Sequence, residues 1–118
     1  MSKLLIFDDD EDILSICVFI FEELGWQVKS YPTCKDHLER IRAFAPDVIL
    51  MDNWIPEEGG IAATQQIKSV PALAKIPVIF FSANSNVGAL ANEAGAEYYL
   101  SKPFELDWLK EVVSRAVK

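Results

Sequence analysis

Five predicted strands are interleaved along the chain with five segments of helical periodicity, and this order limits the possible folds more than any other feature. Four of the strands are short apolar runs, and residues 26–31 instead show an alternation that suggests a more exposed strand near a sheet edge. A strand followed by a helix, five times over, predicts an α/β fold with a parallel five-stranded sheet, helices on both faces and right-handed crossovers. No linker, repeat or low-complexity segment divides the chain, so we predict one domain over residues 1–118. The predicted strands are residues 3–7, 26–31, 48–51, 78–81 and 98–100, and the predicted helices are residues 12–24, 35–44, 61–70, 87–94 and 105–117.

The third predicted strand runs into a carboxylate. Residues 48–51 are all apolar, lie between Pro46 and Pro56, and run directly into Asp52. Such a run is typical of a strand that is buried on both faces, as in a parallel sheet covered by helices. Ligand chemistry in these sheets takes place at the carboxyl ends of the strands. Asp after a strand commonly starts a turn, so Asp52 becomes a functional candidate only together with other strand ends.

Chemically active side chains follow three more of the predicted strands. Asp8 and Asp9 follow the first strand, Ser82 the fourth and Lys102 the fifth. In a flavodoxin-like fold with strand order 2-1-3-4-5, the ends of strands one, three, four and five are neighbours. Carboxylates that gather there repel one another unless a cation lies among them. Oxygen ligands with room for water favour Mg²⁺ over a soft metal.

This set of groups also suits phosphoryl chemistry. A carboxylate such as Asp52 can attack phosphorus and form an acyl phosphate. The charge on the transferred group must then be neutralised, and Mg²⁺, the Lys102 ammonium and the Ser82 hydroxyl are each suited to one phosphoryl oxygen. Each side chain is unremarkable alone, and their predicted convergence makes phosphoryl transfer the favoured chemistry.

Composition and charge narrow the class of protein further. The net charge of −7 argues against nucleic acid as a direct ligand. The amino-terminal apolar run is too short for a signal peptide before the acids begin, and no run has the length of a membrane span. Cys17 and Cys34 lie in helical patterns, which favours buried thiols over a disulfide framework. We therefore expect a soluble cytoplasmic domain that does not contact the membrane.

Four motifs lie in order over the whole chain, at residues 6–10, residues 47–52 with Pro56, residues 77–83 and residues 99–104. Together they resemble the receiver domain of two-component response regulators, of the kind that the chemotaxis regulators represent. The resemblance implies that Asp52 accepts a phosphoryl group from the phosphohistidine of a histidine kinase or a histidine phosphotransfer protein. It implies a signalling phosphoacceptor that catalyses only its own phosphorylation and dephosphorylation, with a downstream effector protein or domain as its target.

The same resemblance assigns roles to individual residues. Asp9, Asp52 and the backbone carbonyl of Trp54 become direct ligands of Mg²⁺, and Asp8 acts through water. Lys102 pairs with the phosphoryl group, and a cis peptide before Pro103 brings its ammonium to the site. Ser82 is then the switch hydroxyl and Tyr99 the switch aromatic, and the face formed by the fourth helix, fifth strand and fifth helix changes shape. Phe19, on the first helix, lies on the side where kinases dock in this family.

Other functions stay open at this point. A receiver-fold interaction module that works without phosphorylation is the main alternative, although such modules usually lose an acid or the lysine. A Mg²⁺-dependent phosphatase commonly has a second acid two residues after its nucleophile, where this chain has Trp54. A flavin or nucleotide site would favour a Gly- or Ser/Thr-rich loop after the first strand, where this chain has acids. The 20 positions from Ser82 to Lys102 are about two fewer than the family leads us to expect, which predicts a short fourth helix or preceding loop.

Overall fold

All five strands belong to one parallel sheet, in the order β2-β1-β3-β4-β5. The computed structural model describes residues 2–53, 59–83, 85–102 and 104–117. The predicted α/β fold and strand order are confirmed, and each predicted element agrees with an observed one to within two residues at either end. The strands are β1 (Lys3–Phe7), β2 (Gln27–Tyr31), β3 (Val48–Asp52), β4 (Val78–Ser82) and β5 (Tyr98–Ser101), and the helices are α1 (Glu11–Glu23), α2 (His37–Phe44), α3 (Gly60–Ser69), α4 (Val87–Ala94) and α5 (Leu106–Ala116).

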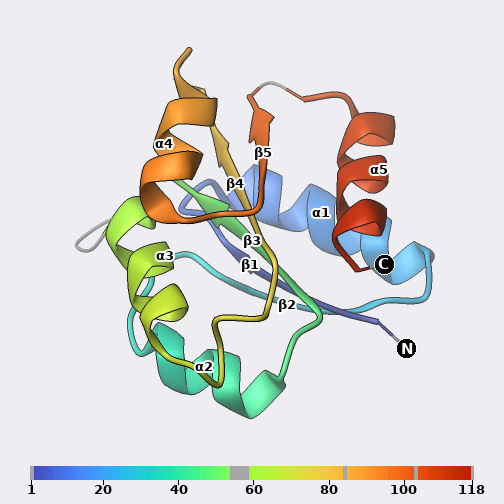
Figure 1. The fold of residues 1–118 in the computed structure, drawn as a ribbon. Coiled ribbons are helices and arrows are strands. Elements are labelled where there is room, and N and C mark those ends of the chain that lie inside the picture. Colours follow the sequence, from blue (N-terminus) through green and yellow to red (C-terminus); the bar gives the residue numbers. More distant parts are fainter. Residues whose placement is uncertain (1, 54–58, 84, 103, 118) are drawn as a thin grey trace.

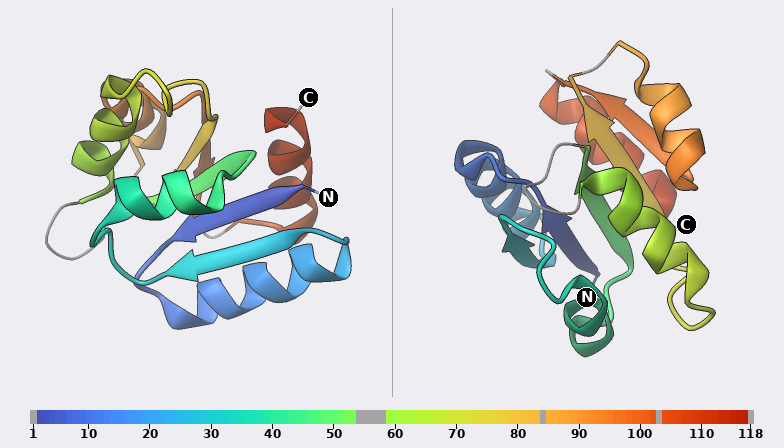
Figure 2. Two further views of the ribbon diagram at one scale, coloured as in Figure 1. Left: turned by 90° about the horizontal axis from the view of Figure 1, so that it is seen from below. Right: turned by 90° about the vertical axis from the view of Figure 1, so that its left-hand side faces the viewer.

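The helices form two layers, one on each face of the sheet. Figure 1 shows α1 and α5 on one side and α2, α3 and α4 on the other, and Figure 2 gives the same arrangement from two further directions. Alternate side chains of β1 follow this division, since Leu5 packs with α2 and α3 whereas Leu4 packs with α1 and α5. The core therefore has two parts, one on each face of the sheet. Cys17 is buried in the part beneath α1 and α5, and Cys34 is buried in the part on the other face. The described part of the chain contains no helix that is long and apolar enough to cross a membrane.

Burial along the strands agrees with their places in the sheet. All five residues of β3 and of β4 are buried, as their apolar sequences predict for central strands covered on both faces. β2 and β5 alternate between more and less exposed residues, which is typical of strands at an edge. The fully buried central strands hold the ends of β3 and β4, and therefore Asp52 and Ser82, in fixed register.

The predicted core stripe of α1 is partly wrong. Helical spacing predicts a core stripe of Ile13, Ile16, Cys17, Ile20 and Leu24, but the side chains of Ile16 and Leu24 are 47% and 53% exposed. Cys17 is buried as predicted, together with Leu14 and Phe21, and Ile13 and Ile20 are partly buried against the core. Because α1 is apolar around much of its circumference, helical spacing fits two stripes that differ by one position. The buried stripe is the one that packs on the sheet and α5, and the Phe21 ring in it also contacts the Trp26 ring. Leu106 in α5, also predicted to point inward, is 47% exposed.

Two helix starts follow from local chemistry. The side chain of Asp10 caps α1 by accepting hydrogen bonds from the backbone N–H groups of Asp12 and Ile13. The second helix begins two residues later than predicted because Asp36 adopts a left-handed backbone conformation with φ of 54°. The turn before it is closed by the His37 N–H, which donates to the Cys34 carbonyl at 3.0 Å.

Candidate functional site

The predicted site residues gather at the carboxyl edge of the sheet. Asp52 and Ser82 end the neighbouring strands β3 and β4, where Asp52 is in register with Phe81. Asp8 follows β1 directly, and Lys102 follows β5. Asp8, Asp52 and Ser82 are all buried, with exposed fractions of 0%, 4% and 5%. Three buried polar side chains at one edge of an otherwise apolar sheet need a chemical reason to be there, because burial of such groups costs free energy.

The run of five acids divides between structure and site. Asp10 caps α1, and Glu11 and Asp12 lie in its first turn, where the helix dipole favours negative charge. Asp8 instead points into the site, where one carboxylate oxygen accepts the N–H of Asp10 at 2.9 Å. Its neighbour Asp9 is exposed. The run thus supplies the N-cap of α1 from Asp10, a buried carboxylate from Asp8 and an exposed carboxylate from Asp9.

Lys102 joins two of the carboxylates. Its ammonium lies 3.0 Å from Oδ2 of Asp8 and 2.9 Å from Oδ1 of Asp52. The same nitrogen lies 4.6 Å from the centroid of the Phe81 ring, which gives it an apolar and weakly attractive surface to rest on. The sequence predicts Lys102 near Asp52, but its simultaneous ion pair with Asp8 is a finding of the structure.

The charges in this cluster shift one another's acidity. The pKa of Asp52 is raised from 3.8 to about 6, mainly by burial and also by the negative charges of Asp8 and Asp9, against the opposing hydrogen bond to Lys102. Burial also raises the pKa of Asp8, although the Asp10 N–H and Lys102 oppose this shift. Burial alone would lower the pKa of Lys102, but its hydrogen bonds to Asp52 and Asp8 raise it above the ordinary value. One ammonium therefore compensates the carboxylates only in part, and the cluster favours a further cation.

Three carboxylates lie close enough to share that cation. Oxygen atoms of Asp8, Asp9 and Asp52 all lie within 4.8 Å of one another. A group of hard oxygen donors, open to water on the side of the exposed Asp9, fits Mg²⁺ better than a metal that prefers nitrogen or sulfur. The residues present therefore fit the predicted ion. Trp54, whose carbonyl is the predicted third ligand, and Pro103, with its predicted cis peptide, lie outside the described residues.

Asn53 is a member of the site that the sequence does not reveal. Its side-chain amide lies 3.5 Å from the Ser82 hydroxyl oxygen. Its backbone N–H donates to the Phe81 carbonyl, and its own carbonyl accepts the N–H of Gly60, both at 3.0 Å. The signal that could have found it is its place directly after Asp52, since the first residue beyond a central strand must still pair with the neighbouring strand.

The start of α3 lies against the backbone of the site. A Cβ atom at Gly60 would overlap the carbonyl oxygen of Asp52, so a residue without a side chain is needed there. This close approach brings the helix directly behind the end of β3.

Tyr99, the predicted switch aromatic, lies outside the carboxylate cluster. It belongs to the edge strand β5, and its side chain is 56% exposed. A Cβ atom added at Gly88 in α4 would lie 3.3 Å from the Tyr99 ring, so the ring rests on the helix where that helix has no side chain. The structure therefore brings together Asp8, Asp9, Asp52 and Lys102. It places Ser82 beside Asn53 at the same edge. Tyr99 lies on the surface of β5, with its ring against α4.

A five-stranded parallel sheet of this order, with an acidic cluster and a lysine at its carboxyl edge, defines the class of flavodoxin-like receiver domains. Residues 4–114 match the family model of the response regulator receiver domain. The chain belongs to this family, which confirms the resemblance.

Known proteins and structures give the same assignment. The chain is 31% identical to the regulatory protein AtoC of Escherichia coli over its whole length but covers only 26% of AtoC. It is 28% identical to the receiver domain of the Francisella response regulator 1452, with a TM-score of 0.88 and coverage of 99% of this chain and 97% of that one. The receiver domain of the sensor histidine kinase PA1611 of Pseudomonas aeruginosa has the same fold, with a TM-score of 0.89 at 24% identity and coverage of 98% of this chain and 97% of that one. That structure is described with a magnesium ion coordinated in its active-site cleft.

Proposed function

We propose that this domain accepts a phosphoryl group on Asp52 from the phosphohistidine of a histidine kinase or a histidine phosphotransfer protein. In this step the P–N bond to the donor histidine breaks, a P–O bond to an Asp52 carboxylate oxygen forms, and the donor leaves as neutral histidine after taking up a proton. The observation that carries the proposal is the buried Asp52 carboxylate held 2.9 Å from the Lys102 ammonium within a group of three acids.

Asp9 and Asp52, the Trp54 carbonyl and, through water, Asp8 are the proposed ligands of Mg²⁺. The ion would supply the positive charge that lets a negatively charged carboxylate and a phosphoryl group approach each other. Lys102 contributes the second positive charge. It pairs with both Asp8 and Asp52 in this structure, so it can move from Asp52 to a phosphoryl oxygen while its bond to Asp8 keeps it in place.

Phosphorylation would then act as a switch. The new negative charge and acceptor oxygens draw the Ser82 hydroxyl toward Asp52. Tyr99 follows into the space that opens, and the face formed by α4, β5 and α5 shifts between two populated states. The effector protein or domain reads this face, and the domain catalyses nothing beyond its own modification. The location we propose is the cytoplasm, where receiver domains meet their kinases.

The first experiment is intact-mass measurement after incubation with acetyl phosphate and Mg²⁺, with Asp52→Asn as the paired variant. We expect one phosphate adduct on the wild type and none on the variant or with a chelator present. A phosphorylated histidine phosphotransfer domain serves as a second donor, because some receivers do not react with small donors.

The alternative function is an interaction module that works without phosphorylation. Failure of both donors to modify the wild type would favour this alternative. An adduct that persists in the Asp52→Asn variant would contradict the assignment of the acceptor.

A further inference from the structure

Lys102 reaches across one strand to the carboxylates with which it pairs. It follows β5, whereas Asp52 ends β3 and Asp8 follows β1, and β4 lies between β5 and β3. Neighbouring strands are about 4.8 Å apart, so the backbones of β5 and β3 are separated by about 10 Å. The stem of Lys102 therefore extends over the end of β4, and the β4 side chain on this face of the sheet influences where the ammonium lies.

That β4 side chain is Phe81. It is in register with Asp52 of β3 and with Leu100 of β5, and neighbours in register project from the same face of a sheet. The centroid of the Phe81 ring lies 4.6 Å from the Lys102 ammonium nitrogen. The ring is fully buried in the part of the core beneath α1 and α5, where the Phe104 ring lies at 62° to it with centroids 6.1 Å apart. Packing therefore fixes the ring that the ammonium contacts.

The ring contact differs in kind from the two ion pairs of Lys102. The ammonium lies 3.0 Å from a carboxylate oxygen of Asp8 and 2.9 Å from one of Asp52, and such bonds depend on the direction of each N–H. A ring face attracts a cation electrostatically and does not require one directed bond. The ammonium can therefore move from Asp52 to a nearby oxygen and keep the attraction of the Phe81 ring.

We propose that Phe81 is a positioning residue for Lys102: the face of its ring holds the ammonium over the end of β4, where it meets the phosphoryl group that Asp52 accepts. This inference rests on the proposed function, because that phosphoryl group is the partner for which Lys102 is positioned. Phe81 acts through Lys102 and does not itself contact the group. An aliphatic side chain would also fill the core but has no attractive ring face, so the electrons of the ring should matter as well as its volume.

The first test uses NMR spectra of the unmodified protein without metal. Protons over the face of an aromatic ring are shifted upfield, so Phe81→Leu should move the signals of the Lys102 ε-methylene protons downfield. Phe80→Leu is the matched control, because Phe80 is equally buried in the same strand but belongs to the part of the core on the other face. Lys102 signals that stay in place in Phe81→Leu, or that move equally in Phe80→Leu, would overturn the contact whatever the state of phosphorylation.

The second test changes the electrons of the ring and nearly keeps its volume. Phenylalanines with one, two or three ring fluorines replace Phe81, and the rate of phosphorylation by acetyl phosphate is measured at saturating Mg²⁺. Fluorine withdraws electrons from the ring face, so the rate should fall stepwise, by about threefold to tenfold in total, as a cation–π contact is lost. The same series at Phe80 should leave the rate unchanged. Because these rings pack almost as phenylalanine does, this test decides even if Phe81→Leu does not fold.

The outcomes separate this inference from the proposed function. If the wild type accepts a phosphoryl group but the rate is the same across the Phe81 series, Phe81 has no positioning role. An equal fall in the Phe80 series would show an effect of core packing in general and would also contradict the inference. Failure of the wild type to accept a phosphoryl group from either donor would instead overturn the proposed function, and the inference with it.

Discussion

At the scale of single residues, Asp52 has an unusual environment for a carboxyl group. It is a carboxyl group with 4% of its surface exposed and a pKa raised to about 6, mainly by burial. Its ammonium partner is shared with Asp8, so the negative charge of Asp52 is only partly compensated. A buried carboxylate whose charge is compensated only in part gains from an added cation, and this links the acidity of Asp52 to the proposed metal binding.

The raised pKa predicts a specific dependence of stability on pH. A carboxyl whose pKa is higher in the folded state contributes stability below its unfolded value of 3.8, and this contribution is lost as the pH rises through about 6. We therefore compare the free energy of unfolding of Asp52→Asn with that of the wild type, with a chelator present. The variant's advantage should be larger at neutral pH than near pH 4, by on the order of 2 kcal/mol. Urea unfolding of both proteins at several pH values measures it.

Added Mg²⁺ provides the control for this prediction. The ion should stabilise the wild type more than Asp52→Asn at neutral pH, because the variant lacks one of the carboxylates that we propose as its ligands. A difference between the two proteins that does not change with pH would contradict the proposed titration of Asp52.

At the scale of secondary-structure elements, most of the fold could be predicted because four strands are short apolar runs, β2 shows an alternating pattern, and the helices show helical periodicity. Strand order in turn placed Asp8, Asp52, Ser82 and Lys102 at one edge. The sequence alone does not predict contacts between the side chains of different helices and strands. The second ion pair of Lys102, the contact of Asn53 with Ser82 and the choice between two stripes on α1 all depend on how finished elements pack.

The outer surface of α1 carries a prediction about partners. Phe19 is 67% exposed there, and loss of an exposed side chain usually changes stability by less than about 0.5 kcal/mol. If a histidine-containing donor docks on α1, Phe19→Ala should slow phosphotransfer from a phosphorylated histidine phosphotransfer domain by about fivefold, the effect of losing an interface contact of about 1 kcal/mol. Stopped-flow or quenched transfer assays measure this rate.

Two controls accompany this prediction. Phosphorylation by acetyl phosphate should be unchanged in Phe19→Ala, because it needs no docking surface. Leu24→Ala removes another exposed apolar side chain, 53% exposed at the far end of α1, and should leave transfer unaffected. Equal rates for Phe19→Ala and wild type would exclude Phe19 from the interface.

The pairing of α4 with β5 gives a second prediction at this scale. Glycine inside a helix is less stable than alanine by up to about 1 kcal/mol, so Gly88 in the short α4 needs a reason. A methyl group at this position would lie 3.3 Å from the Tyr99 ring, closer than ordinary contact, and the ring would have to move. Gly88→Ala should therefore stabilise the Tyr99→Ala variant by up to about 1 kcal/mol but stabilise the wild type by at most half as much.

Urea unfolding of the four proteins in this cycle measures the coupling, and the Tyr99 ring signals in NMR spectra should shift in Gly88→Ala. The contrary result is that Gly88→Ala gives the same gain in stability in the wild type and in Tyr99→Ala, with unchanged ring signals. This result would contradict the prediction, because the position of the Tyr99 ring would then not depend on the missing side chain at Gly88.

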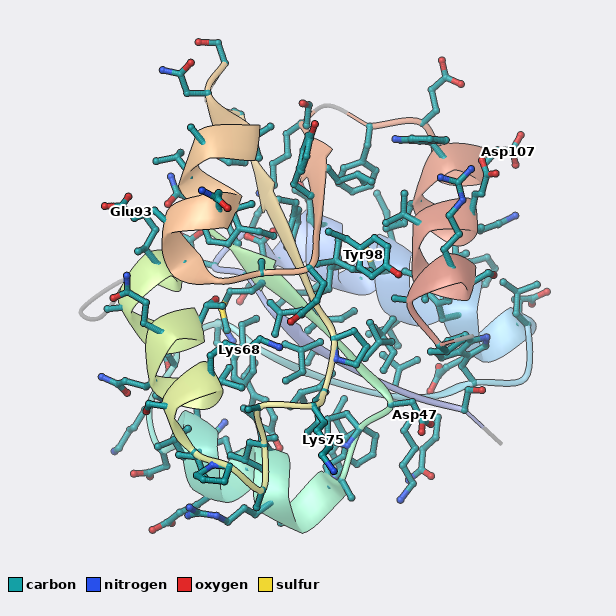
Figure 3. All side chains as sticks on the ribbon, in the orientation of Figure 1. Asp47, Lys68, Lys75, Glu93, Tyr98 and Asp107 are labelled. Atoms are coloured by element: carbon teal, nitrogen blue, oxygen red, sulfur yellow. The ribbon has the colours of Figure 1, made fainter. Side chains whose placement is uncertain are left out.

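At the scale of the whole molecule, the two ends of the sheet have different tasks. The carboxyl edge holds the candidate site. At the amino edge, Lys68 of α3 links the segments that precede β4 and β5, and its side chain is 16% exposed. Its ammonium donates to the carbonyls of Ala74 at 3.1 Å and Ile76 at 2.7 Å and lies 2.7 Å from a carboxylate oxygen of Glu97. Glu97 also accepts the N–H of Val78, at the start of β4. Figure 3 shows Lys68 among these segments, and Lys75 at a separate position.

Removal of the Lys68 ammonium should lower stability without affecting the site. Lys68→Met keeps most of the apolar stem but leaves two backbone carbonyls and one carboxylate without this donor, which we expect to cost on the order of 1–3 kcal/mol. Lys75→Met, at an exposed position of the same connection, should change stability by less than about 0.5 kcal/mol. Urea midpoints at constant m-value measure both effects.

Because Lys68 contacts the amino ends of β4 and β5 and not the carboxyl edge, the phosphate adduct on Asp52 should form in Lys68→Met under conditions where the variant is folded. Equal stability of the two lysine variants would mean that water replaces the ammonium without loss. A folded Lys68→Met that forms no adduct would mean that the two edges of the sheet are coupled, and the separation of stability from chemistry argued for this domain would be wrong.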